Sequence, residues 1–185
     1  MLKEIRIHGR GGQGAVTAAQ ILAHAAFLEG RSVQAIPYFG AERRGAPVRA
    51  FARISDEPIL VHSQVYHPDY VIVMAANLMK VVDITEGIRK NGFVLINSPK
   101  EPQKVGLDGC RVATVDATGI AIDLGLLVAG SPVVNTAILG AFAKATGEIG
   151  LDNTLKSIRN VWHGAAGEKN VEAATLAYER VMEGS

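Results

Sequence analysis

Cysteine is almost absent from this sequence. Cys110 is the single cysteine among 185 residues, so the chain cannot form an internal disulfide or ligate a metal cluster through its own cysteines. No segment has the ~18 consecutive apolar residues that a membrane-spanning helix needs. The first residues include the charged Lys3, Glu4 and Arg6, which argues against a signal peptide. These absences predict a cytoplasmic protein without a metal centre of its own.

Excess charge and aromatic residues are also scarce. The chain has 19 basic and 18 acidic residues and a formal net charge of +1, so no global field attracts it to nucleic acid or to an anionic membrane. Aromatic residues make up 5% of the chain, yet 48% of it is hydrophobic, which is enough for a sizeable core. The length and the lack of linkers or repeats predict one domain spanning residues 1–185.

Apolar strand-like segments alternate with helical ones along the chain. This order predicts an α/β fold, a three-layer, Rossmann-like αβα arrangement with a mostly parallel sheet. A β-hairpin made by residues 48–55 and a short return strand at 59–61 is expected as an insertion. The other expected strands are 4–8, 31–39, 70–75, 92–98 and 110–117. The expected helices are 15–28, 77–88, 117–128, 134–146, 151–162 and 168–182.

Residues 9–14, GRGGQG, match the pattern G-x-G-x-x-G between a predicted strand and a predicted helix. Glycines permit positive φ and remove the Cβ atoms that would keep a ligand away, while the N–H groups of the helix favour phosphate or carboxylate. A dinucleotide site also requires an acidic residue at the end of the second strand, and this strand ends AIPYFG. We therefore expect an anionic ligand or a partner chain against this loop. Tight packing of strand, loop and helix is the alternative.

A second candidate is the arginine loop, GAERRGAP at residues 40–47, which contains Arg43 and Arg44. In a doubly wound topology it would lie next to the glycine loop. Guanidinium groups bind carboxylate and phosphate through a planar fork of donors. Arg49 and Arg53 follow on the next strand, and a solvated, charged hairpin is the alternative interpretation for all four arginines.

Few other residues are candidates for chemistry. Asn135 stands near the start of a predicted helix, where capping is expected and ligand contact is the alternative. The spacing of histidines, carboxylates and hydroxyls indicates no catalytic triad, acid–base pair or metal site. We therefore expect no catalytic residue in this chain.

Three blocks of sequence, taken together, indicate a family. They are IRIHGRGGQGAVTAAQILAHAA, YFGAERRGAPVRAFARIS and SPVVNTAILGAFAKAT. In this order they resemble the gamma subunit of pyruvate and other 2-oxoacid:ferredoxin oxidoreductases, over nearly the whole chain. The resemblance implies alpha, beta and delta partner subunits, which hold thiamine diphosphate and 4Fe–4S clusters, and electron transfer to ferredoxin through the complex. The implied reaction is CoA-dependent oxidative decarboxylation of a 2-oxoacid, with pyruvate the expected substrate.

The resemblance also implies an occupant for the glycine loop. Coenzyme A, as co-substrate, carries phosphates that would suit this loop, although a neighbouring subunit could use the same surface. The candidate contacts are Gly9, Arg10, Gly11, Gly12, Gln13, Gly14, Arg43, Arg44 and Asn135. Two alternatives stay open: the small subunit of an indolepyruvate or 2-oxoglutarate:ferredoxin oxidoreductase, and, from another class, a stand-alone Rossmann-type nucleotide-binding module.

Overall fold

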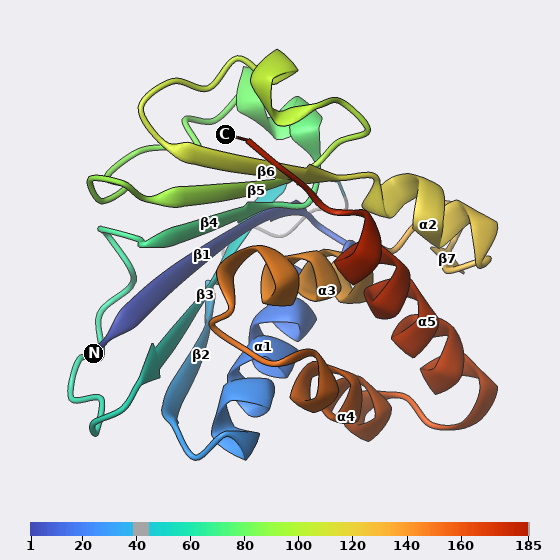
Figure 1. Ribbon diagram of the computed structural model, residues 1–185, viewed down its shortest axis with the longest axis horizontal. Helices are drawn as coiled ribbons and strands as arrows, with labels where there is room; N and C mark the ends of the chain where they lie inside the picture. Colours follow the sequence, from blue (N-terminus) through green and yellow to red (C-terminus); the bar gives the residue numbers. More distant parts are fainter. Residues whose placement is uncertain (39–44, 185) are drawn as a thin grey trace.

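The structure, a computed structural model, describes residues 1–38 and 45–184 and is built around a seven-stranded sheet (Figure 1). Its strands are β1 (Lys3–Arg10), β2 (Ser32–Tyr38), β3 (Pro47–Ser55), β4 (Tyr70–Val73), β5 (Phe93–Asn97), β6 (Arg111–Val115) and β9 (Met182–Glu183). They lie side by side in the order β2-β3-β1-β4-β5-β6-β9. A separate two-stranded ribbon consists of β7 (Leu127–Val128) and β8 (Ser131–Pro132).

The four strands β1, β4, β5 and β6 run parallel at the centre of the sheet. β5 is buried along its whole length, as its continuous apolar sequence predicts for a strand covered on both faces. β3 runs antiparallel between β1 and β2, and β9 runs antiparallel to β6. β2 forms one edge, where Pro37 is tolerated because an edge strand can spare an N–H. The predicted α/β fold with its mostly parallel sheet is confirmed.

The helices gather on one face of the sheet. They are α1 (Ala15–Leu28), α2 (Ala117–Asp123), α3 (Asn135–Thr146), α4 (Leu151–Val161) and α5 (Gly164–Arg180). Figure 1 shows α1, α3, α4 and α5 on the same side. The other face packs a second apolar cluster, including Val71, Val94 and Ile84, beneath irregular segments and the 3-10 helices η1 (Ala76–Lys80) and η2 (Pro102–Lys104). No helix among the described residues has the length and apolar character needed to cross a membrane.

The predicted hairpin is wrong in its pairing. Residues 59–61 form no strand, and β3 pairs instead with β2 and β1. Because β3 already has a neighbour on each side, no free edge is left for the return segment, and Leu60 is 83% exposed. The inserted hairpin therefore consists of β2 and β3.

Several predicted helix boundaries are also wrong. Residues 77–88 form only η1, because the Asp83 carboxylate accepts hydrogen bonds from the N–H and the hydroxyl of Thr85 and so stabilises a turn. The helix expected to reach residue 128 ends at Asp123, and Gly125 takes a left-handed conformation just beyond it. The last helix starts earlier than expected, at Gly164, and is followed by β9.

Candidate functional site

The glycine loop makes a sharp turn between β1 and α1. Two hydrogen bonds between Arg10 and Gln13 close the turn. The Gln13 backbone N–H donates to the Arg10 carbonyl at 3.0 Å, and the Arg10 N–H donates to the Gln13 side-chain Oε1 at 2.8 Å. Gly12, at φ 94°, has a backbone conformation that favours glycine, and a Cβ placed there would meet no atom of the described residues within 4 Å. The loop is thus held by its own hydrogen bonds, and none of the residues that the structure describes covers Gly12.

The glycine loop lies beside the end of the arginine loop. The Gly11 N–H donates to the Ala46 carbonyl at 2.9 Å, and the Gly45 N–H donates to the Gly11 carbonyl at 3.1 Å. The Arg10 guanidinium also donates to the Gly45 carbonyl, at 2.8 Å. These contacts follow from the antiparallel pairing of β1 with β3. The expected proximity therefore holds for Gly45 and Ala46, whereas Arg43 and Arg44 lie outside the described residues.

Asn135 brings the start of α3 against the start of α1. A Cβ at Gly14, which has φ 80°, would lie 2.6 Å from Asn135 Nδ2, so only glycine fits this contact. Asn135 is 2% exposed, and its Oδ1 accepts a hydrogen bond from the Thr136 N–H at 2.9 Å. Its side chain therefore satisfies a donor in the first turn of α3 and packs on the glycine loop from behind. Val134 occupies the cap position itself.

The start of α1 offers backbone donors without competing groups of its own. No side chain caps this helix, and no acidic residue lies in its first turn. The first N–H groups of a helix have no partner within the helix, and together they carry a partial positive charge. This end of α1, beside the open Gly12, can therefore accept a phosphate, a carboxylate or a carbonyl group of another molecule.

Among the described residues, the histidine nearest the glycine loop is poorly suited to acid–base chemistry. His8, two residues before Arg10, is 2% exposed. Burial, together with the positive charges of Arg6 and Arg49, lowers its pKa to about 3. The imidazole is therefore neutral at pH 7 and without ready access to solvent. Within the described ranges, no three His, Cys, Asp or Glu residues cluster as metal ligands would.

Asn97, which sequence reasoning missed, ties together the neighbouring strand ends. Its Nδ2 donates to the Met74 carbonyl at 2.8 Å and to Thr118 Oγ1 at 2.9 Å, and its Oδ1 accepts from the Thr118 N–H at 3.1 Å. An asparagine closing the buried run FVLIN was the available signal. Because these hydrogen bonds stay within the chain, Asn97 has a structural role at the carboxyl ends of the strands.

The strand order disfavours a nicotinamide dinucleotide site. In the dinucleotide-binding fold, the acidic residue that holds the ribose ends the strand beside β1. Here β3 lies between β1 and β2, and the last residue of β2 is Tyr38. The described residues therefore lack the ribose-binding arrangement of that fold.

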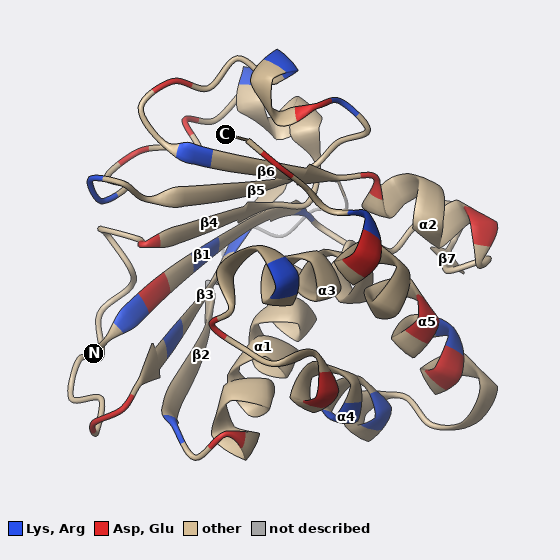
Figure 2. Ribbon diagram, viewed as in Figure 1, with Lys and Arg blue, Asp and Glu red and all other residues tan. Residues whose placement is uncertain are grey.

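Arg53 is neither a solvated arginine nor an anion-binding one. It is 1% exposed, and its Nε donates to Glu4 Oε1 at 2.9 Å. A second nitrogen donates to Gln34 Oε1 at 3.2 Å, and Arg89 binds the other oxygen of Glu4 at 3.2 Å. Figure 2 shows both acidic and basic residues on β1 and basic residues on the neighbouring β3. The solvated-hairpin alternative is therefore wrong for Arg53, which takes part in a buried ion pair.

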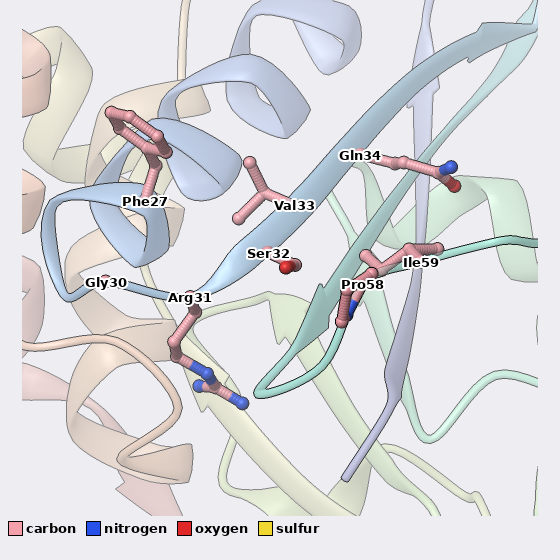
Figure 3. A pocket seen from close by; sticks show the side chains of 8 residues that line it. All are labelled: Phe27, Gly30, Arg31, Ser32, Val33, Gln34, Pro58 and Ile59. Carbon is pink, nitrogen blue, oxygen red and sulfur yellow. The ribbon is translucent and has the colours of Figure 1, made fainter.

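A hollow of about 700 Å³ lies at the opposite end of α1, between that helix, the start of β2 and the segment after β3 (Figure 3). Its described lining contains one charged residue, Arg31, which pairs with Glu148 at 3.3 Å and with Asp56 at 3.5 Å. The remaining lining residues are apolar or uncharged, Phe27 and Ile59 among them. The described lining of this hollow therefore includes no charged side chain that is free of an ion pair.

Comparison with known proteins gives consistent matches over the whole chain. Residues 4–180 match the family described as pyruvate ferredoxin/flavodoxin oxidoreductase. Pyruvate synthase subunit PorC of Methanocaldococcus jannaschii is 52% identical over 179 residues, 97% of each chain. The pyruvate/ketoisovalerate oxidoreductases common subunit gamma of Thermococcus kodakarensis is 50% identical over 183 residues, also 97% of each chain. The crystal structure of pyruvate oxidoreductase subunit PORC of Thermotoga maritima superimposes with a TM-score of 0.86 at 37% identity, covering 100% of this chain and 99% of that one.

Proposed function

This chain belongs to the pyruvate ferredoxin/flavodoxin oxidoreductase family, as a gamma subunit. We propose that it is required for the activity of a multi-subunit enzyme and has no such activity when isolated. The complete enzyme converts a 2-oxoacid, CoA and oxidised ferredoxin into acyl-CoA, CO2 and reduced ferredoxin. In this proposal residues 1–185 act as one domain in the cytoplasm, alongside alpha, beta and delta subunits. Pyruvate, which the names of the relatives include, is the proposed substrate.

The redox and carbon chemistry belongs to the partner subunits in this proposal. A 4Fe–4S cluster takes four cysteine thiolates, and this chain has one cysteine. The chain therefore does not fit an iron–sulfur cluster, and the clusters and thiamine diphosphate are assigned to the partners. The described residues around the glycine loop supply backbone donors and packing, which support binding and assembly more than bond cleavage.

The single observation that carries the site is the open side of Gly12 beside the uncapped start of α1. Coenzyme A, whose phosphates match the donors there, is the proposed occupant, and a partner subunit is the competing one. The proposed contacts run from Gly9 to Gly14, with Arg43 and Arg44 contributing charge. Asn135 would support the site indirectly, because its side chain packs against the loop at Gly14.

The choice of 2-oxoacid is assigned to other subunits. The Thermococcus relative is named as a gamma subunit common to pyruvate and ketoisovalerate oxidoreductases. A gamma chain shared in this way would not itself distinguish the two substrates. A branched-chain 2-oxoacid is therefore the second candidate substrate.

The test is reconstitution with and without this chain. The alpha, beta and delta subunits are co-expressed with it or without it, and CoA-dependent ferredoxin reduction is measured with pyruvate, 2-oxoisovalerate and 2-oxoglutarate. We expect activity only when the chain is present, highest with pyruvate, and no iron in the chain purified alone. Full activity without it, or stoichiometric iron in the isolated chain, would contradict the proposal.

A further inference from the structure

A second polar site lies on the opposite face of the sheet from α1. Ile5 and Ile7 of β1 pack in the cluster that contains α1, so the intervening Arg6 points to the other face. There a cleft of about 380 Å³ opens between β1, β3 and two irregular segments. This volume lies within the range of small-molecule sites, roughly 300–1,000 Å³. Its described lining consists of Arg6, Arg49, Gln64, Val65, Tyr66, His67, Glu86 and Gly87.

Arg6 is a buried cation with hydrogen-bonding capacity to spare. It is 3% exposed, and one terminal nitrogen donates to the carbonyls of Ile84 at 3.0 Å and Glu86 at 2.7 Å. Its Nε is buried and has no hydrogen-bond partner among the residues that the structure describes. A buried donor without an acceptor costs free energy, and this is larger when the donor carries charge. The guanidinium is thus held in place by backbone carbonyls, which bring no neutralising charge.

Arg49 adds a second positive charge to the same cleft. Its side chain is partly exposed, and its nitrogen lies 3.8 Å from Glu86 Oε2, beyond hydrogen-bonding distance. Burial lowers the pKa of Arg6, Arg49 lowers it further, and Glu86 and Asp83 oppose this. The pKa of the neighbouring His8 is lowered by burial and by the same two arginines. The positive field of Arg6 and Arg49 is therefore only partly balanced by Glu86 and Asp83.

We propose that this cleft binds the oxyanion of a small molecule, a phosphate or a carboxylate, between Arg6 and Arg49. Guanidinium forks match the planar oxygens of either group, and an oxyanion would give the buried Nε of Arg6 an acceptor. The site differs from the glycine loop, which follows the carboxyl end of β1. It is independent of the function proposed above, because only residues of this chain form it.

The test uses the full chain, titrated with inorganic phosphate and, in parallel, with malonate. Binding is followed by two-dimensional NMR that includes the arginine Nε–H signals, in low chloride at constant ionic strength so that screening does not change. We expect saturable shifts of the Arg6 and Arg49 signals, and the tighter probe will identify the preferred oxyanion. Saturation at these signals by neither probe would overturn the proposal.

Three variants make the test specific. Arg49→Gln should weaken binding about tenfold or more, whereas Glu86→Gln, which removes the opposing carboxylate, should tighten it severalfold. Arg180→Gln is the control, because it removes the same charge from an exposed position at the end of α5. Equal effects of Arg49→Gln and Arg180→Gln, or no gain in affinity from Glu86→Gln, would show that the anion responds to the overall charge of the protein. Either result would contradict a specific site in this cleft. Loss of subunit assembly in Arg49→Gln without anion binding by the wild-type chain would replace the proposal with a protein interface.

Discussion

Arg53 and Glu4 form an ion pair that crosses two strands in the interior of the molecule. Arg53→Met would leave the Glu4 carboxylate buried with only the partly exposed Arg89 beside it. Removing one partner of a buried pair costs about 3–5 kcal/mol of unfolding free energy. Arg89→Met, which removes an exposed partner of the same carboxylate, should cost about 0–1 kcal/mol. Urea unfolding of both variants measures this difference, and equal losses would show that the burial of Arg53 contributes nothing particular.

His8 predicts a specific pH dependence of stability. Its pKa is lowered from 6.5 to about 3 in the folded chain, so between these values the unfolded state binds a proton that the folded state does not. Stability is therefore complete above about pH 6.5 and falls as the pH drops, by at most about 1.4 kcal/mol per unit. Between pH 6.5 and 4.5 the wild-type chain should lose about 2 kcal/mol more than His8→Phe, which cannot protonate. Chemical denaturation at several pH values tests this, and parallel curves would refute it.

The polar residues of β1 mark where sequence reasoning fails at this scale. The segment EIRIH was correctly predicted as a strand, and its alternating Ile5 and Ile7 lie in the core. It could not indicate that Arg6 and His8 are also buried, because the pattern of a strand does not show which distant segments cover its second face. The cleft between Arg6 and Arg49 therefore could not be predicted from the sequence, because it depends on where the segments around 64–67 and 84–87 lie in space.

Helices α3 and α5 pack tightly against each other at a glycine. A Cβ at Gly140 would lie 1.9 Å from the Ala174 carbonyl oxygen, so Gly140→Ala must push the two helices apart. Overpacking of this kind costs about 1–3 kcal/mol, more than the small gain in helix propensity from alanine. Lys144→Ala, at an exposed position on the same helix, should change stability by less than about 1 kcal/mol. Thermal or urea unfolding gives both values, and a Gly140→Ala variant as stable as wild type would contradict the contact.

Element types could be predicted more reliably than element neighbours. The buried strands β4, β5 and β6 and the helix α1 follow directly from apolar runs and periodicity. The partner of β3 does not, since an alternating strand has the same pattern whether it pairs with the segment before it or after it. The glycine loop was predictable because its motif is local, whereas its contact with Asn135 joins segments more than a hundred residues apart.

At the scale of the whole molecule, the glycine loop is the surface at which we expect a ligand or a partner subunit to bind. Gly12 and Gly30 both have positive φ, and a Cβ at either would meet no described atom within 4 Å. Asparagine tolerates this conformation better than most residues, so Gly12→Asn and Gly30→Asn should lower the stability of the isolated chain by similar amounts, about 1 kcal/mol. Their positions differ, because Gly12 precedes α1 and Gly30 follows it.

The most direct measurement compares these two variants in the assembled enzyme, using the yield of complex and the kcat/KM for CoA. If a ligand or partner lies against the loop, Gly12→Asn should lower one of these values about tenfold or more, while Gly30→Asn stays within about twofold of wild type. A reduced kcat/KM at normal yield would identify CoA as the occupant, and a reduced yield would identify a partner subunit. Equal values for the two variants, both near wild type, would contradict the claim that this loop is a contact site.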